Sequence, residues 1–501
     1  MRGIPSLITD IRKKVFTEVA RMAYEGGDYT QAEDLPYRIV PGDQPLHRES
    51  IFLERAIAGE RVRLAMGLGV RPIQTRTLMT DGMDQAAIAE QYYEPPLINM
   101  IPYACHSCPT KQYRVTESCQ NCLAASCQKV CPVGAISFVN GKSQIDTARC
   151  IKCGKCAAAC PYHAIIHLER PCEAACGMDA ISPGPDGRAV INQDKCVACG
   201  QCLVSCPFGA IVDKGQIFQV IQSILRGDQV IAIVAPAFAG QFGKKSTPAK
   251  FTAAMKKLGF ERVVEVAVGA DLCTIEEARD FLEKVPAQQP FMATSCCPAW
   301  HAMVHKLFPA QSANISMTLT PMVYTARLVK KTFPACRVVF VGPCAAKKLE
   351  AIRADIRSDV DFVLTFEELQ GMFEAKDIEV GAMEPEESPS ESTAAGRNFA
   401  VSGGVAAAVE QVIHEMHPDM EVKIARADGL RDCRRLMTAA RAGKYNGYLL
   451  EGMGCPGGCI AGAGTILSLD QAAKMVAKYA SDAENSSPLQ SPFANVAESL
   501  D

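Results

Sequence analysis

The sequence predicts a multidomain α+β protein in which a cysteine-rich region of short βαβ units precedes a larger α/β domain. Its 501 residues exceed the usual size of one hydrophobic core, and 48% apolar with 21% charged residues is typical of a folded chain. Sixteen of the 24 cysteines lie between Cys105 and Cys206, and strand patterns alternate with helical patterns beyond Gly227. The expected domains are a helical and irregular region (1–104), the cysteine-rich region (105–215), the α/β domain (216–480) and a polar, disordered tail (481–501).

Composition excludes several classes of protein. The net charge of −3 offers no basic surface for nucleic acid. The N-terminus lacks the apolar core of a signal peptide, and the longest apolar run, Val230–Ala239, is about half of a membrane-spanning length. We therefore expect no membrane span and a cytoplasmic protein. In the first region, apolar residues at helical spacing predict a helix over 49–66.

Two cysteine runs repeat each other. The pattern Cys-x2-Cys-x2-Cys-x3-Cys-Pro begins at Cys150 and again at Cys196, and a looser copy begins at Cys119. In bacterial ferredoxins three cysteines of this run hold one 4Fe–4S cube and the fourth reaches a second cube. Zinc is the alternative, but its sites usually pair two short Cys-x2–4-Cys knuckles. We predict tandem ferredoxin-like units, with one cube on Cys119, Cys122, Cys127 and Cys160 and another on Cys131, Cys150, Cys153 and Cys156.

A further run is incomplete. Cys172-x3-Cys176 is the second half of a run whose first two cysteines are missing at the expected distance. Three or four accessory cubes are open at this point, because part of this group could be free thiols. His106 is a further candidate ligand, although a surface histidine is the simpler interpretation. The four-cube hypothesis places one cube on Cys176, Cys196, Cys199 and Cys202 and another on Cys105, Cys108, Cys172 and Cys206.

The C-terminal half predicts a mostly parallel sheet with helices between its strands. Ligands of such sheets gather at the carboxyl ends of the strands. Buried strands are expected at 230–236, 263–268, 338–343 and 448–451, and helices near 247–258, 274–284, 318–331, 404–416 and 431–441.

Cysteine-bearing loops lie at three strand ends, at 294–300, 342–350 and 451–464. No single loop could hold a cube, but together they offer four or five thiolates on one face. Glycines in the last loop let the backbone approach a bulky inorganic group. The isolated cysteines Cys273, Cys336 and Cys433 are instead interpreted as small buried apolar residues.

These three loops resemble the signature motifs of the FeFe hydrogenases, and the ferredoxin-like block is similar to that family's architecture; the resemblance covers roughly residues 105–470. It implies a two-lobed catalytic domain with an H-cluster, a 4Fe–4S cube joined to a di-iron unit that carries CO, cyanide and a bridging azadithiolate. Cys296 would pass protons to the bridging amine, Lys347 would donate to a cyanide, and Met453 would pack beside the di-iron unit. The implied cluster ligands, of which the last would bridge cube and di-iron unit, are Cys297, Cys344, Cys455 and Cys459.

The resemblance also implies a proton route. Glu277 and Asp280 fall where the family places two acids that lead from the surface, and Ser316 falls at its relay serine. At i and i+3 the two acids share one helix face. Alternating carboxyl and hydroxyl groups can pass a proton inward, and a thiol can finish the chain.

Four departures from the family pattern indicate a divergent, group B-like branch. They change groups around the cluster, which tune its potential and hydrogen bonds, and leave the ligand cysteines in place. The departures are Ala237 for serine, Met322 for glutamine, Gly342 for methionine and Ala299 for glycine.

The resemblance thus implies an oxidoreductase that catalyses 2H⁺ + 2e⁻ ⇌ H2, with ferredoxin or a similar one-electron carrier as partner and maturation proteins that supply the di-iron unit. Three alternatives stay open: a hydrogen-sensing relative of low turnover, a Narf-like iron–sulfur protein without the di-iron unit, and a plain polyferredoxin. Cys296 argues against the sensor, and Lys347 and Met453, which only a di-iron unit would need, argue against the Narf-like protein.

Overall fold

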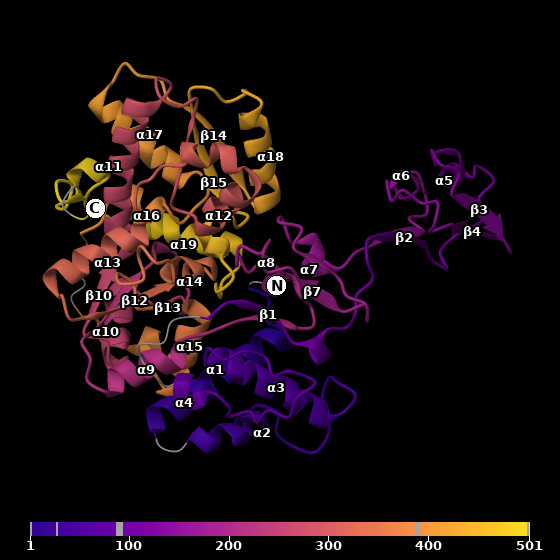
Figure 1. Cartoon of the computed structure of the whole chain (residues 1–501), viewed down its shortest axis with the longest axis horizontal. Coiled ribbons are helices and arrows are strands. Elements are labelled where there is room, and N and C mark those ends of the chain that lie inside the picture. Colours follow the sequence, from indigo (N-terminus) through magenta and orange to yellow (C-terminus); the bar gives the residue numbers. More distant parts are fainter. Residues whose placement is uncertain (1–2, 27–28, 87–93, 387–390, 498–499, 501) are drawn as a thin grey trace.

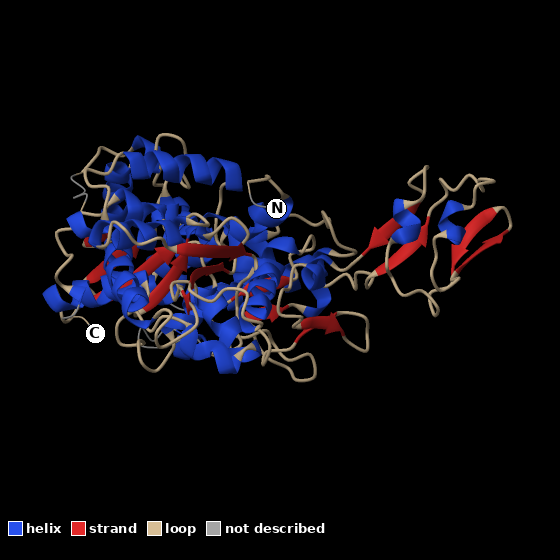
Figure 2. Cartoon of the chain, turned by 90° about the horizontal axis from the view of Figure 1, so that it is seen from above, coloured by secondary structure: helices blue, strands red, loops and turns tan. Residues whose placement is uncertain are grey.

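The computed structural model describes residues 3–26, 29–86, 94–386, 391–497 and 500. These residues form a large body from which one slender arm projects in both views (Figures 1 and 2). The arm carries β2–β5, α5 and α6, and the body holds the remaining elements. Among the described helices, none is both long enough and apolar enough to cross a bilayer.

The N-terminal region is a helical layer packed on the α/β domain. Ser6 caps α1 (Leu7–Glu25) with a reciprocal capping box, and Ser50 caps α3 (Ile51–Ala65), so the helix predicted over 49–66 is confirmed. Valine and phenylalanine side chains of α1 join one core with α9 (Ile217–Leu225) and α15 (Phe366–Ala375). The remaining helices of this region are α2 (Leu35–Ile39) and α4 (Met83–Ala86).

The cysteine-rich region contains two ferredoxin-like modules, and one is inserted into the other. The inner module (94–108 and 170–215) is closed by β1, which pairs antiparallel with β8 and brings the two segments together. Its elements are β1 (Ile98–Met100), α7 (Pro171–Ala174), β6 (Ile181–Pro183), β7 (Ala189–Ile191), α8 (Gln201–Ser205) and β8 (Ile211–Asp213).

The outer module (109–169) is the projecting arm. Its strands form the antiparallel pairs β2–β5 and β3–β4. The expected tandem order is therefore wrong in one respect: the modules are nested, because pairing of residues 98–100 with 211–213 outweighs sequence adjacency. The elements of the arm are β2 (Gln112–Val115), α5 (Ser126–Lys129), β3 (Ile136–Val139), β4 (Lys142–Ile145), α6 (Lys155–Ala158) and β5 (Ile165–Leu168).

The α/β domain has two lobes, each built on a parallel sheet, as expected. The first sheet has the order β10–β9–β12–β13 and the second has the order β11–β15–β14. The strands are β9 (Val230–Val234), β10 (Arg262–Glu265), β11 (Met292–Ala293), β12 (Arg337–Gly342), β13 (Phe362–Thr365), β14 (Lys423–Asp428) and β15 (Tyr448–Met453).

One predicted strand is partly a helix. The strand expected over 263–268 ends at Glu265, and α11 (Val266–Lys284) begins at once. This helix is buried almost all round at its start, so its valines resemble a buried strand in sequence. A Cβ on Gly269 would lie 2.2 Å from the Pro321 carbonyl oxygen, so α11 and α13 pack backbone to backbone.

The other helices of the domain cover the two sheets, and the predicted helices near 247–258, 318–331, 404–416 and 431–441 are confirmed within a few residues. They are α10 (Pro248–Leu258), α12 (Pro298–Leu307), α13 (Pro321–Thr332), α14 (Ala346–Ala351), α16 (Ala394–Asn398), α17 (Gly404–Met416), α18 (Leu430–Arg441) and α19 (Leu469–Ser481).

The C-terminal segment differs from the disorder expected of its polar composition. After α19 it forms a 3-10 turn (Pro488–Gln490) and returns to the body, where Ala497 and Leu500 are buried against α11 and α13. Its few apolar side chains bury enough surface to order the segment. Residues 498–499 and 501 of this expected tail lie outside the described residues.

A buried ionic cluster joins three parts of the chain. The Lys348 ammonium donates to Asp213 (2.8 Å) and to Glu368 (3.2 Å), and its side chain is fully buried. Arg12 of α1 lies 3.8 Å from Asp213 and pairs with Glu367. The cluster therefore connects the N-terminal layer, the inner module and the α/β domain.

Lys348→Met is expected to destabilise the apoprotein by about 3–5 kcal/mol, because it leaves two buried carboxylates without their cation. Urea unfolding followed by the fluorescence of Trp300, the single tryptophan, measures the change. Exposed Lys478→Met is the control. A loss below 1 kcal/mol would contradict this role.

Candidate active site

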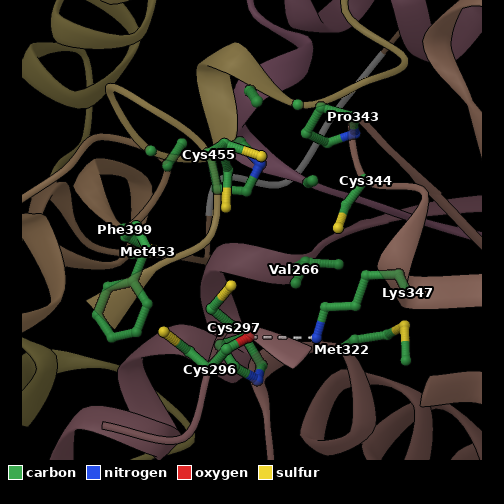
Figure 3. A pocket seen from close by; sticks show the side chains of 18 of the residues that line it. Val266, Cys296, Cys297, Met322, Pro343, Cys344, Lys347, Phe399, Met453 and Cys455 are labelled. Carbon is green, nitrogen blue, oxygen red and sulfur yellow. Dashed lines mark hydrogen bonds between the residues drawn. The ribbon is translucent and has the colours of Figure 1, made fainter. Parts of the chain in front are cut away.

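The candidate site lies between the two sheets, where three loops meet. The loops follow β11, β12 and β15, so each leaves the carboxyl end of a parallel strand. They enclose a cavity of about 80 Å³ whose walls are almost entirely apolar. Figure 3 shows side chains from all three loops directed toward this common space.

Four cysteines that lie far apart in the sequence line this one cavity, as expected. Cys297 accepts a hydrogen bond from the Gly454 amide (3.3 Å), and Cys455 accepts one from the Gln201 side chain (3.2 Å). Burial raises the pKa of Cys344 to about 12, and the neighbouring thiols Cys455 and Cys297 add to the shift. The four cysteines are Cys297, Cys344, Cys455 and Cys459.

This environment fits a metal cluster. Four converging thiolates in an apolar cavity would repel one another and lack solvation, so only bound cations could make them stable as ligands. Among the described residues, no three His, Cys, Asp or Glu side chains are placed to hold a single metal ion. A 4Fe–4S cube spaces its thiolates more widely than one ion does, and the donor set is the one that such a cube takes.

The remaining predicted residues of the site also border the cavity. Cys296 and Met453 lie on the wall near Phe399, and Lys347 enters from the opposite side (Figure 3). The Lys347 ammonium donates to Glu350 (2.6 Å) and approaches the Cys296 carbonyl oxygen at 3.5 Å. Glu350, which the sequence did not single out, therefore orients this lysine.

The four departures lie at or beside the cavity. Ala237 and Met322 line it, and Ala299 packs at the Gly454 backbone. A Cβ on Gly342 would meet the Phe340 ring at 2.5 Å, so this ring takes the space that a side chain at 342 would need. Phe340 also lines the cavity and was not predicted.

The predicted proton-route residues are only partly connected. Buried Glu277 accepts hydrogen bonds from the Ser295 amide (2.9 Å) and hydroxyl (3.2 Å), while its second carboxyl oxygen has no partner. Burial raises the pKa of Glu277 to about 7. Asp280 is bonded to Lys284 (2.8 Å) and carries no hydrogen bond to Glu277 among the described contacts.

Ser316 lies one step further along the same network. Its hydroxyl contacts the Thr318 hydroxyl (2.8 Å), and the Ser295 hydroxyl donates to the Thr318 carbonyl oxygen (2.9 Å). Ser295 and Thr318 are the links that sequence reasoning missed, although Ser295 directly precedes Cys296. Burial raises the pKa of Cys296 well above its usual range, and nearby Glu277 adds to the shift, so this thiol keeps its proton at neutral pH.

Comparison with known proteins gives the family. Residues 228–463 match the iron-only hydrogenase large subunit, C-terminal domain, and residues 143–166 and 189–212 match the 4Fe-4S binding domain. The chain belongs to the FeFe hydrogenase family. It is therefore an iron–sulfur protein.

The curated relatives include both hydrogenases and proteins named for other roles. The NADP-reducing hydrogenase subunit HndD of Solidesulfovibrio fructosivorans is 28% identical over 50% of this chain and 53% of its own. The periplasmic [Fe] hydrogenase large subunit of Nitratidesulfovibrio vulgaris is 28% identical over 47% of this chain and 68% of its own. The nuclear prelamin A recognition factor of Xenopus laevis is 25% identical over 53% of this chain and 71% of its own. The chain thus spans only about half the length of the first of these relatives.

Among solved structures, a variant of the [FeFe]-hydrogenase HydA1 from Chlamydomonas reinhardtii covers 53% of this chain and 88% of its own, with 21% identity and a TM-score of 0.44.

In this family member, the inner module holds two groups of four cysteines. One group surrounds a small cavity of about 10 Å³ and consists of Cys105, Cys108, Cys172 and Cys206. The other lies beside it, and its members perturb one another's pKa values; it consists of Cys176, Cys196, Cys199 and Cys202. The structure therefore brings together the residues of the two cubes expected here, although the number of cubes stays a prediction. His106 stacks on Phe208 and does not line up as a fifth thiol-like donor.

The second of these groups touches the candidate active site. A Cβ on Gly200 would lie 2.4 Å from the Cβ of Ala463 and 3.3 Å from that of Ala345, so the Cys199 loop passes directly beside the loops of Cys344 and Cys459. This approach would give electrons a short path.

The outer module brings its eight cysteines to a small core of its own. Cys127, Cys131, Cys156 and Cys160 pack together with the strands of the arm. The assignment of its two cubes to particular ligands stays a prediction.

Proposed function

We propose that the protein is a ferredoxin-dependent FeFe hydrogenase that catalyses 2H⁺ + 2e⁻ ⇌ H2. The observation that carries this proposal is the position of Cys296, a non-ligand thiol that borders the cavity of the four cysteines and adjoins buried Glu277. A structural cube would need no protonated thiol beside it and no acid behind that thiol.

The chain's own residues would hold and orient the cluster. Cys297, Cys344, Cys455 and Cys459 would ligate the H-cluster, which supplies the redox-active iron and a basic amine at which H2 is split or formed. Lys347, oriented by Glu350, would donate to a cyanide, and Met453 would pack beside the di-iron unit. The apolar walls would keep water away from the reacting site.

Protons would move along residues of this chain. Cys296 would take a proton from the cavity and give it to Glu277, whose second carboxyl oxygen has no other partner. Ser295, Thr318 and Ser316 would continue the route toward the surface, where neighbouring Met317 is exposed. Asp280 would act as a second acid only through intervening water.

Electrons would travel between the arm and the cavity. Cubes in series pass one electron at a time, and the outer module, the inner module and the Cys199 loop follow one another toward the active site. The partner would be a ferredoxin or a similar one-electron carrier, and maturation proteins would supply the di-iron unit. Such oxygen-sensitive centres imply an anaerobic cytoplasm.

A second candidate is a Narf-like iron–sulfur protein without the di-iron unit. The presence of the nuclear prelamin A recognition factor and of cytosolic iron–sulfur assembly components among the relatives favours it. A hydrogen-sensing protein of low turnover is the third. The group B-like branch expected from Ala237, Met322, Gly342 and Ala299 is compatible with the first and third of these functions.

Infrared spectroscopy and a hydrogen assay on one matured sample test these functions. The hydrogenase requires both the CO and cyanide bands and rapid turnover. Bands with little turnover would indicate a sensor, and cubes without bands would indicate the Narf-like protein or a polyferredoxin.

The arm offers a docking surface for the carrier. Its 61 residues hold seven Lys and Arg against three Asp and Glu, in a chain whose net charge is −3. Of the 24 cysteines, Cys153 alone is exposed, and Ile151, Lys152 and Lys155 surround it at the surface. A cube at this loop would therefore lie close to an acidic carrier bound there.

Lys152→Glu with Lys155→Glu is expected to slow reduction of the protein by an acidic ferredoxin about tenfold at low ionic strength, because charge steers association. Stopped-flow rates measured against salt concentration test this. The control is Lys474→Glu, an exposed charge change on the body. Equal rates for all three proteins would exclude the arm as the docking surface.

A further inference from the structure

The site of one accessory cube is interrupted in the sequence. Cys105-x2-Cys108 and Cys172-x3-Cys176 together have the spacing of one ferredoxin run, and the whole outer module is inserted between its second and third cysteines. In the other full runs the corresponding cysteines lie three residues apart. The interrupted site therefore needs a contact that holds its two halves together.

Arg170 provides this contact. Its Nη2 donates to the Cys108 carbonyl oxygen (2.9 Å) and to the Gly187 carbonyl oxygen (2.8 Å), which joins the chain before the insertion to the chain after it. The residue is only 2% exposed. Its Nε and Nη1 are buried without a hydrogen-bond partner, and the nearest described acid, Glu173, is 3.7 Å from Nε and partly exposed.

The guanidinium faces the cysteines. Arg170 lines the small cavity that the four thiols of the interrupted site surround. Burial raises the pKa of Cys172 to about 12, and the charge of Arg170 opposes this shift, as it does at Cys108. A cationic group with unused donors thus lies beside the position of the cube.

Two more arginines border the same site. Buried Arg61 donates to the Gly209 carbonyl oxygen (3.0 Å) and interacts electrostatically with Cys206. Arg48 donates to the carbonyl oxygens of Ala104 (3.3 Å) and Phe208 (3.2 Å). At the neighbouring group of Cys176, Cys196, Cys199 and Cys202, the cation with described contacts is Lys306, whose side chain is exposed.

We propose that Arg170, with Arg61, raises the reduction potential of the interrupted cube above that of the neighbouring cube, so that the interrupted cube holds an electron between the arm and the active site. The step is [4Fe–4S]²⁺ + e⁻ → [4Fe–4S]⁺, with the electron supplied by the carrier. The reduced cube has one more negative charge, which a buried cation stabilises more strongly than an exposed one. Arg170 is in this sense a positioning residue.

The proposal rests on the accessory cubes and is independent of the di-iron unit. Its test uses the full-length protein reconstituted anaerobically with iron and sulfide and no di-iron unit, so a failure of hydrogen turnover would leave it unaffected. Redox titration followed by electron paramagnetic resonance gives the potential of each cube, and Cys108→Ser, which alters one ligand, identifies the signal of the interrupted site.

Arg170→Gln keeps amide donors and removes the charge, whereas Arg170→Lys keeps the charge. The first is expected to weaken electron binding at the interrupted cube about tenfold, which lowers its potential by about 59 mV, and the second is expected to leave it near the parent value. Arg149→Gln is the matched control, because Arg149 lies beside Cys131 and donates to the Val133 carbonyl oxygen but is exposed.

An unchanged potential in Arg170→Gln, or equal shifts in both variants, would overturn the proposal. If Arg170→Gln fails to assemble the cube, Arg61→Gln decides, because Arg61 does not bridge the interrupted halves. A shift to a lower potential there supports the proposal, and an unchanged potential refutes it.

Discussion

Cys296→Ala in the matured protein is expected to lower hydrogen turnover by about 10²–10⁴-fold while the infrared bands of the cluster remain. The thiol borders the cavity but is separate from the four proposed ligands, so its removal should spare the metal site. Alanine cannot carry a proton between the cavity and Glu277. Turnover and infrared spectra of the same sample measure the two effects.

Cys336→Ala is the matched control, because Cys336 is also a buried thiol but packs under β12, away from the cavity. It should retain full turnover. Undiminished activity in Cys296→Ala would remove this thiol from the proton route, and loss of the infrared bands would show instead that it maintains the cluster.

Glu277→Gln is expected to reduce turnover to a similar degree, with the cluster again intact. Glutamine has nearly the same shape, and its carbonyl oxygen can accept both hydrogen bonds from Ser295. It cannot exchange a proton near neutral pH, whereas burial holds the Glu277 pKa at about 7. Steady-state hydrogen production at several pH values measures the loss.

The same substitution should change how stability depends on pH. Between the ordinary pKa of 4.5 and the folded-state value of about 7, the folded protein keeps a proton that the unfolded chain releases. Stability therefore falls as pH rises through this range and stays low above it. The penalty is about 3 kcal/mol above pH 7, and Glu277→Gln should remove it.

Unfolding free energies of the apoproteins at pH 5 and pH 8 test this point, since the difference between variant and parent isolates Glu277. Asp280→Asn is the control, because Asp280 is partly exposed and pairs with Lys284. It should change turnover only slightly. A parent and a Glu277→Gln variant with the same pH dependence would mean that Glu277 ionises freely in the fold.

Much of the architecture could be predicted because its signals are local. The four strand patterns and the helix patterns of the C-terminal half depend on the spacing of apolar residues along one segment, and the parallel sheets followed. The strand at 263–268 was partly wrong because a helix buried all round, as at the start of α11, has no polar face to mark its period.

The sequence by itself determined the chemistry of the cysteine loops, because ligand type and spacing are set within a few residues. Only the tertiary structure decided that the two modules are nested, that Arg170 joins the halves of one cysteine site, and that Phe340 fills the space beside Gly342. It also decided that Ser295, more than Ser316, holds Glu277. Each of these contacts joins side chains or segments that the chain brings together by packing, and no spacing along the chain encodes such a meeting.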